Sequence, residues 1–98
     1  MESGMKFEWD ENKNLANIAK HEVSFERAET VFDDPNALYF YDEIHSDDED
    51  RYIVIGIDNE RYALTVCHCY RGRDEDIVRI ISARNANKYE KSLYWEVR

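Results

Sequence analysis

Apolar positions recur with helical spacing in the first third of the chain. Leu15, Ile18 and Ala19 lie at i, i+3 and i+4, which predicts that they form the buried face of a helix. Asp10 is a suitable N-cap for this helix, which is expected to end near His21.

A second helix is expected between Ser24, another candidate N-cap, and Asp34. A residue that precedes proline disfavours the helical conformation, so the helix should end before Pro35. Its apolar stripe is formed by Phe25, Ala28, Val31 and Phe32.

Later segments have the length and the β-branched and aromatic content of strands. These segments are residues 37–44, 52–57, 61–70 and 77–83. A short extended segment, residues 6–9, precedes the first helix, and Asn85 is expected to cap a last helix. The apolar face of that helix is Ala86, Tyr89, Leu93 and Val97. Short connections favour antiparallel pairing, so the prediction is one α+β domain over residues 1–98: an antiparallel four-stranded sheet with two N-terminal helices and one C-terminal helix.

The composition argues against a membrane protein and against a disulfide-bonded one. No apolar run in the 98 residues reaches the ~20 residues that span a bilayer. We therefore expect a cytoplasmic protein without membrane contact. Cys67 and Cys69 are too close in sequence for an unstrained disulfide, which agrees with a reducing compartment.

Charge is unevenly distributed along the chain. Residues 1–60 carry five basic and seventeen acidic side chains, net −12, whereas residues 61–98 carry eight basic and five acidic ones, net +3. Phosphate binding depends on clustered Lys and Arg, so contact with nucleic acid is expected in the C-terminal third. The acidic part is expected to meet a basic or amphipathic element of a protein partner.

His68 is a candidate acid/base residue near the end of the third strand. Alternation places it on one strand face with Tyr62, Leu64, Val66 and Tyr70. Imidazole changes charge near neutral pH, which suits proton transfer. The alternative is a half-buried structural histidine that is hydrogen bonded at the end of the sheet.

Arginines are concentrated on the last two predicted strands and at their ends. They are Arg71, Arg73, Arg79 and Arg84. A guanidinium group stays charged and donates paired hydrogen bonds to phosphate. Each arginine could instead form an ion pair with one of the 22 carboxylates. Alternation places Arg71 on the face opposite His68, unless the strand ends before it.

Metal chemistry has little support in the sequence. Cys67, His68 and Cys69 point to alternate faces of a strand, so they cannot converge on one ion, and core thiols are expected. The acidic run at residues 47–50 lacks the spacing of a calcium loop and is expected to be a solvated hairpin tip, with His45 beside it exposed and inert. The chain has no Gly-rich phosphate loop, no G-x-S-x-G and no H-E-x-x-H.

Short motifs follow one another over residues 6–94. In the N-terminal part they are Phe7-Glu8-Trp9-Asp10, Asn14, Lys20-His21-x-Val23-Ser24-Phe25-Glu26 and Val31-Phe32-x-Asp34-Pro35. In the centre and the C-terminal part they are His45-Ser46, Glu49-x-Arg51-Tyr52, Tyr70-Arg71, Arg79-Ile80-Ile81-Ser82-Ala83-Arg84-x-Ala86, Glu90 and Tyr94. Their number and order resemble the BrnT toxin family. One departure is Glu22, where the family has a glycine suited to a left-handed helix end, and glutamate there is expected to cost some stability.

The resemblance implies a RelE-like fold and a metal-independent ribonuclease toxin of a type II toxin–antitoxin pair, with no cofactor. It also implies a small BrnA-like antitoxin with a ribbon-helix-helix part, through which the complex would bind operator DNA. At the matching positions, Arg71 and Arg84 are expected to bind phosphate, His68 to act as base or acid, and Tyr94 to donate a proton or stack on a base. The residues expected to bind RNA are Arg73, Arg79 and Lys88.

Two other functions remain open. A catalytically degenerate toxin could hold its antitoxin and act as a transcriptional co-repressor, and growth arrest in the absence of antitoxin distinguishes the two. An acidic, metal-dependent enzyme built on residues 47–50 would lose activity in excess chelator.

Overall fold

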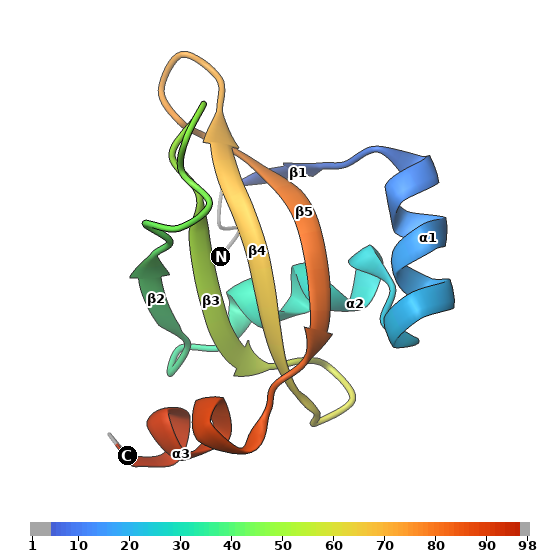
Figure 1. The fold of residues 1–98 in the computed structure, drawn as a ribbon, viewed down its shortest axis with the longest axis vertical. Helices are drawn as coiled ribbons and strands as arrows, with labels where there is room; N and C mark the ends of the chain where they lie inside the picture. The colour runs from blue at the N-terminus through green and yellow to red at the C-terminus, as the bar shows by residue number, and fades with distance from the viewer. Residues whose placement is uncertain (1–4, 97–98) are drawn as a thin grey trace.

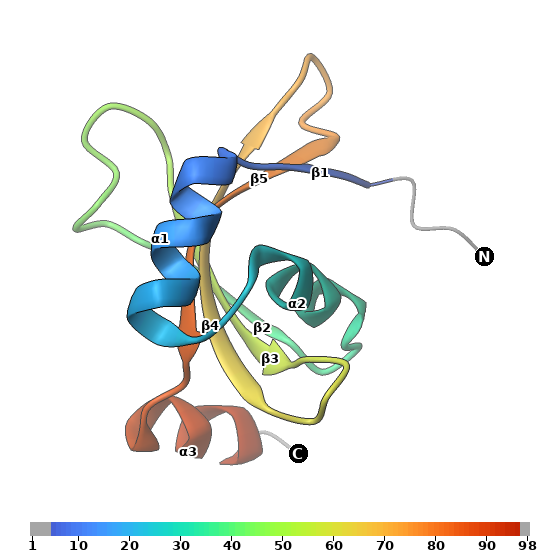
Figure 2. The same cartoon turned by 90° about the vertical axis from the view of Figure 1, so that its right-hand side faces the viewer.

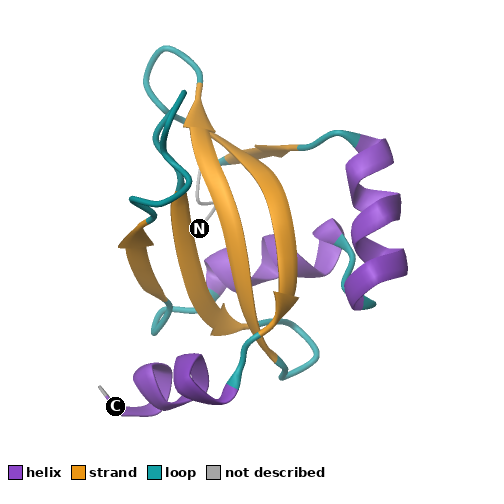
Figure 3. Cartoon of the chain, viewed as in Figure 1, coloured by secondary structure: helices purple, strands orange, loops and turns teal. Residues whose placement is uncertain are grey.

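The computed structural model describes residues 5–96 as a mixed five-stranded sheet with three α-helices (Figures 1 and 3). The strand order across the sheet is β1-β5-β4-β3-β2. In chain order the elements are β1 (Lys6–Glu8), α1 (Glu11–His21), α2 (Phe25–Thr30), the 3₁₀ turn η1 (Val31–Asp33), β2 (Leu38–Tyr41), β3 (Tyr52–Ile57), β4 (Ala63–Arg71), β5 (Ile77–Asn85) and α3 (Lys88–Glu96).

The prediction of a four-stranded, fully antiparallel sheet is wrong in one respect. The extended segment at the start of the chain is a strand, β1, which pairs in parallel with β5, Lys6 opposite Ile77. Phe7 of β1 packs against the main core and holds this strand in place. The antiparallel pairings among β2, β3, β4 and β5 are as predicted. A short connection predicts pairing only between strands that are neighbours in the sequence. β1 instead pairs with β5, a strand near the other end of the chain, so this pairing was not predicted.

The two faces of the sheet differ in what covers them. Helix α2 and η1 lie on one face, and the loop between β2 and β3 projects from the other, which we call the open face (Figure 2). Helix α3 covers one end of the open face, where Tyr94 packs with Ile55 and Ala86. The main core lies between the sheet and the helices and consists of Val23, Phe25, Ala28, Val31, Val54, Leu64, Val66, Val78, Ile80 and Ala83.

The buried face of α1 is polar, contrary to the prediction. Leu15 and Ile18 are 57% and 38% exposed, whereas Asn17 is buried. The Asn17 amide donates to the carbonyls of Val23 and Ala83 at 2.8 and 2.7 Å, and its Oδ1 accepts from the Ala83 N–H at 3.1 Å. Helix α1 lies beside the part of β5 that β1 does not reach (Figure 1). Asn17 therefore satisfies the edge of β5 as a neighbouring strand would.

Helix starts at Asp10 and Ser24 are confirmed. The carboxylate of Asp10 accepts from the N–H groups of Asn12 and Lys13, and the Ser24 hydroxyl accepts from the N–H of Arg27. Helix α1 ends at His21, as predicted, and the capping residue Glu22 adopts the left-handed conformation at φ 59°. This is the conformation for which glycine is preferred at a helix end.

The last helix is capped by Asn87 rather than by the predicted Asn85. Oδ1 of Asn87 accepts from the N–H of Glu90, and the Glu90 carboxylate accepts from the N–H of Asn87, which is a capping box. Asn85 belongs instead to β5, which is longer than predicted. Val97, the last residue of the predicted apolar face, lies outside the described residues.

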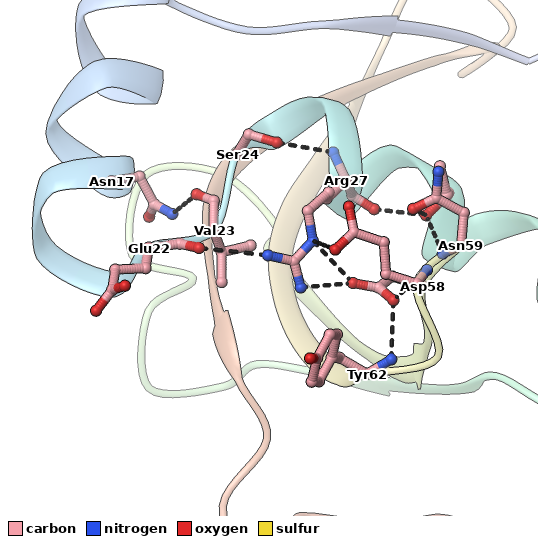
Figure 4. A network of polar contacts seen from close by, with 10 residues as sticks. Asn17, Glu22, Val23, Ser24, Arg27, Asp58, Asn59 and Tyr62 are labelled. Carbon is pink, nitrogen blue, oxygen red and sulfur yellow. Dashed lines mark hydrogen bonds and ion pairs between the residues drawn. The ribbon is translucent and has the colours of Figure 1, made fainter.

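An ion pair between the buried carboxylate of Asp58 and the partly exposed guanidinium of Arg27 ties α2 to the turn between β3 and β4 (Figure 4). Oδ2 of Asp58 accepts from Nε and Nη2 of Arg27 at 3.0 and 2.7 Å. Oδ1 of Asp58 accepts from the N–H groups of Glu60 and Tyr62. The guanidinium group also lies 5.4 Å from the centre of the Tyr62 ring. The network therefore links α2 to the β3–β4 turn, and removal of Arg27 would leave the buried Asp58 carboxylate without its charged partner.

Candidate functional site

A cavity of about 220 Å³ lies on the open face, between the β2–β3 loop and the middle of the sheet; we call it the open-face cavity. Thr65 pairs with Arg84 across the strands, and Cys67 pairs with Ser82. The register then shifts, so that Ile81 is an extra residue on β5, and such a bulge redirects nearby side chains. The lining residues are Asp42, His45, Arg51, Ile53, Thr65, Cys67, Ile81, Ser82 and Arg84.

His45 and Asp42 form a hydrogen-bonded pair at the open-face cavity. Nδ1 of His45 lies 2.8 Å from Oδ2 of Asp42. The Asp42 side chain is 8% exposed, whereas that of His45 is 64% exposed. We expected an exposed histidine here, but not one oriented by a buried carboxylate. A carboxylate that accepts from Nδ1–H favours the tautomer with a free Nε2 lone pair, which is the arrangement of a general base.

Arg51 brings a guanidinium group to the same cavity, and it also borders a second hollow that is lined by Asp47, Asp48 and Glu49. Its Nε is fully buried and has no hydrogen-bond partner within residues 5–96. In this part of the chain no carboxylate lies within ion-pair distance of the Arg51 guanidinium. An unpaired buried donor costs about 1–3 kcal/mol, which a bound anion would offset. The geometry suits an anionic ligand.

Arg84 is positioned by Glu90 of α3. Its Nη1 and Nη2 donate to the two carboxylate oxygens at 2.8 and 2.9 Å, and Glu90 also accepts from the Thr65 hydroxyl at 2.9 Å. The hydrogen bond to Glu90 raises the pKa of Arg84. Burial opposes ionisation of Glu90, but hydrogen bonds, chiefly from Arg84, hold its pKa below the ordinary value. The Arg84 side chain is still 41% exposed, so it is fixed in place and accessible to a ligand.

His68 lies on the face of the sheet opposite the cavity. It is fully buried, and the rings of Phe32, Tyr39, Tyr52 and Tyr70 surround it at centroid distances of 4.9 to 6.2 Å. Burial lowers the pKa of His68 to about 4. The geometry therefore favours the structural alternative, a neutral imidazole among aromatic rings.

Arg71 and Tyr94 also lie outside the cavity. Nη2 of Arg71 donates to both carboxylate oxygens of Glu49 at 2.8 and 2.9 Å. Nε of Arg71 contacts the Cys69 sulfur, so its side chain is on the open face, as alternation predicts. Tyr94 is 3% exposed, and its hydroxyl donates to Oδ2 of Asp34 at 2.6 Å. In this position Tyr94 anchors α3 to the sheet.

The structure does not bring together the three residues predicted to bind RNA. Arg79 forms an ion pair with Glu8 of β1 at 2.9 Å. Arg73 is exposed in the β4–β5 loop, and Lys88 is exposed at the start of α3. Of all the predicted site residues, Arg84 alone lines the open-face cavity.

The sequence analysis did not single out Asp42, His45 and Arg51, which the structure places in the lining of the open-face cavity. The available signal was in the motifs His45-Ser46 and Glu49-x-Arg51-Tyr52, which carry part of the family resemblance. Their convergence on the sheet depends on the path of an irregular loop, which no periodicity predicts.

Cys67 lines the cavity as a protonated thiol. Burial raises the pKa of Cys67, so the thiolate is not populated near neutral pH. Within residues 5–96 no three His, Cys, Asp or Glu side chains are grouped so that they could hold a metal ion. In the same part of the chain no helix has the length and apolar character needed to cross a membrane.

Comparisons with known proteins agree with the family resemblance. Residues 9–90 match the model of a family described as the ribonuclease toxin BrnT of type II toxin–antitoxin systems. Among solved structures, the chain is similar to the ribonuclease toxin BrnT of Brucella abortus, with 29% identity, a TM-score of 0.66, and coverage of 86% of this chain and 99% of that one. No curated protein matches. Because the family match spans most of the chain and all of the open-face cavity, the chain belongs to the BrnT family of ribonuclease toxins of type II toxin–antitoxin systems.

Proposed function

We propose that this chain is an endoribonuclease that cleaves RNA at the open-face cavity. The observation that carries the proposal is that one cavity combines the His45–Asp42 pair with the guanidinium groups of Arg51 and Arg84. Cleavage by the RNA 2′-hydroxyl needs a base for that hydroxyl and positive charge near the reacting phosphate. The cavity offers both.

In this proposal His45 is the base and Asp42 is a positioning residue. The 2′-oxygen attacks the adjacent phosphorus while its proton passes to Nε2 of His45. The bond from phosphorus to the 5′-oxygen breaks, and the leaving oxygen takes a proton from solvent. The products are a 2′,3′-cyclic phosphate and a 5′-hydroxyl, and Arg51 and Arg84 stabilise the charge on the non-bridging oxygens.

We further propose that the reaction is independent of metal ions. Two guanidinium groups supply the positive charge that a metal ion supplies in other phosphoryl-transfer sites. Cleavage should therefore persist in excess EDTA. Loss of activity in EDTA, with recovery on adding Mg²⁺ or Mn²⁺, would contradict this.

For the partner we propose a small BrnA-like antitoxin with a ribbon-helix-helix part, which carries the contacts with operator DNA. A type II toxin has a protein antitoxin, and this chain has a net charge of −9, which is unsuited to binding DNA directly. Co-purification with the product of the neighbouring reading frame tests the partner. Operator binding by the complex, but not by the toxin alone, tests the division of roles.

The test of the proposed site is cleavage of a defined RNA by purified wild-type, Arg51→Ala and Arg84→Ala proteins. Loss of one preorganised charge donor typically lowers the rate by ~10²–10³. Arg73→Ala is the matched control, because Arg73 is exposed and lies outside the cavity. Wild-type rates in both cavity variants would refute the site. A folded wild-type chain that binds its antitoxin but neither cleaves RNA nor arrests growth would instead be the degenerate, co-repressor form of the toxin.

A further inference from the structure

Five aromatic side chains form a patch on the helix-covered face of the sheet, which we call the aromatic patch; they are Phe32, Tyr39, Tyr41, Tyr52 and Tyr70. Tyr39 pairs with Val54 of the core, and Tyr41 pairs with Tyr52, so these side chains share the face opposite the open-face cavity. Adjacent rings are 5.3 to 6.1 Å apart.

The aromatic patch is not fully buried within the chain. Tyr39 and Tyr41 are 49% and 51% exposed, and they belong to β2, the strand at the edge of the sheet. Neighbouring exposed aromatic residues on one surface are typical of binding sites for other macromolecules.

Carboxylates surround the aromatic patch. A hollow of about 320 Å³ beside it is lined by Tyr52 and Tyr70 together with Asp50 and Glu75. The remaining lining residues are Glu49, Cys69 and Arg71, and the charge of Arg71 is matched by its ion pair with Glu49.

The other charges near the aromatic patch have the same sign. The Tyr41 hydroxyl donates to Asp50 at 2.9 Å. Burial raises the pKa of Tyr39, and the negative charges of Asp34 and Asp33 raise it further. Burial likewise raises the pKa of Tyr70, to which Glu75 contributes. The surface around the rings is therefore acidic.

We infer that the aromatic patch and its acidic rim dock a basic, amphipathic segment of the protein antitoxin, with an Arg or Lys side chain in the hollow between Tyr52, Tyr70, Asp50 and Glu75. A cation in this hollow is attracted both by the faces of the aromatic rings and by the carboxylates. Apolar side chains of the same segment would cover the exposed tyrosine rings. RNA could stack bases on the same rings, but the carboxylates would repel its phosphates. The inference does not depend on RNA cleavage, because the rings of the patch lie on the face opposite the open-face cavity and the hollow shares no lining residue with that cavity.

The test measures binding of the purified antitoxin from the neighbouring reading frame to the full chain, by biolayer interferometry. The double variant Asp50→Lys with Glu75→Lys reverses the charge of the acidic rim. The control is Asp47→Lys with Asp48→Lys, because it makes the same change in net charge at exposed positions outside the hollow. The dissociation constant is expected to rise at least tenfold for the rim variant and less than threefold for the control, with a steeper salt dependence for wild type than for the rim variant. Equal effects of the two double variants would mean that the attraction depends on net charge alone, which would overturn the inference.

A second arm tests the tyrosine rings themselves. Tyr39→Ser with Tyr41→Ser should weaken antitoxin binding at least tenfold, whereas Tyr89→Ser, at a still more exposed position on α3, should not. Circular dichroism establishes that the variants are folded. If the double variant binds antitoxin normally but loses affinity for a single-stranded RNA oligonucleotide, the patch serves RNA and the inference fails. The readout is affinity rather than cleavage, so failure of the proposed ribonuclease site would leave this result unchanged.

Discussion

Nδ1 of His45 lies 2.8 Å from Oδ2 of Asp42 at the open-face cavity. A buried carboxylate thus orients an exposed imidazole. His68, by contrast, is fully buried on the opposite face of the sheet among aromatic rings. The geometry therefore separates the two histidines, and the proposal assigns proton transfer to His45 and a structural role to His68.

The buried His68 should make the stability depend on pH. Its pKa is about 4 in the folded protein and near the ordinary value of 6.5 in the unfolded chain. Between these values the unfolded chain binds a proton that the folded chain does not. The free energy of unfolding therefore falls as the pH decreases from about 6.5 to 4, by up to about 3 kcal/mol from this group.

Urea denaturation near pH 7 and near pH 4.5 measures this effect. His68→Gln should be less stable than wild type near neutral pH, because it disrupts the aromatic surroundings, but it should lose less stability on acidification. Equal losses in the two proteins would contradict a low pKa for His68.

Asn17→Ala should be strongly destabilising. It leaves the N–H and carbonyl of Ala83 and the carbonyl of Val23 without their partner, at about 1–3 kcal/mol for a buried group, so a total of about 2–4 kcal/mol is expected. Leu15→Ala on the exposed side of the same helix is the control and should change stability by less than about 0.5 kcal/mol. Thermal and urea unfolding of the two variants provide the comparison, and the reverse order would refute the orientation of α1.

Much of the fold could be predicted from the sequence, because the helix starts at Asp10 and Ser24 and each long strand have a local signal. The orientation of α1 could not be predicted. The apolar spacing of Leu15 and Ile18 suggests one buried face, but the hydrogen-bonding groups at the edge of β5 determine which face is buried, and the sequence does not show that edge. The site was less predictable. Arg84, which lines the cavity, was predicted from its residue type and its place in a strand, whereas the positions of Arg51 and His45 depend on how an irregular loop crosses the sheet.

Glu22→Gly should stabilise the protein. Glu22 has a φ of 59°, and a side chain in the left-handed conformation costs about 1–2 kcal/mol, part of which is offset by the greater freedom of glycine in the unfolded chain. A net gain of about 0.5–1 kcal/mol is expected in urea unfolding. Glu22→Ala retains a Cβ and should give little gain; an equal gain there would mean that removal of the charge, rather than relief of the backbone, is responsible.

Arg71→Ala tests whether residues of the open face outside the cavity contribute to RNA cleavage. Arg71 is bound to Glu49, at a distance from the lining of the cavity, so its loss should lower the cleavage rate by less than about tenfold. Arg84→Ala, measured in the same assay, should lower it by ~10²–10³. Equal losses would place Arg71 in direct contact with the reacting phosphate.

The most direct test of the catalytic assignment is the rate of RNA cleavage by wild type, His45→Gln and His68→Gln, each shown to be folded and measured in excess EDTA. If His45 is the base, His45→Gln should lower the rate by about 10²–10⁴, while His68→Gln should cleave RNA at close to the wild-type rate. A wild-type rate in His45→Gln, or a comparable loss in His68→Gln alone, would contradict the account.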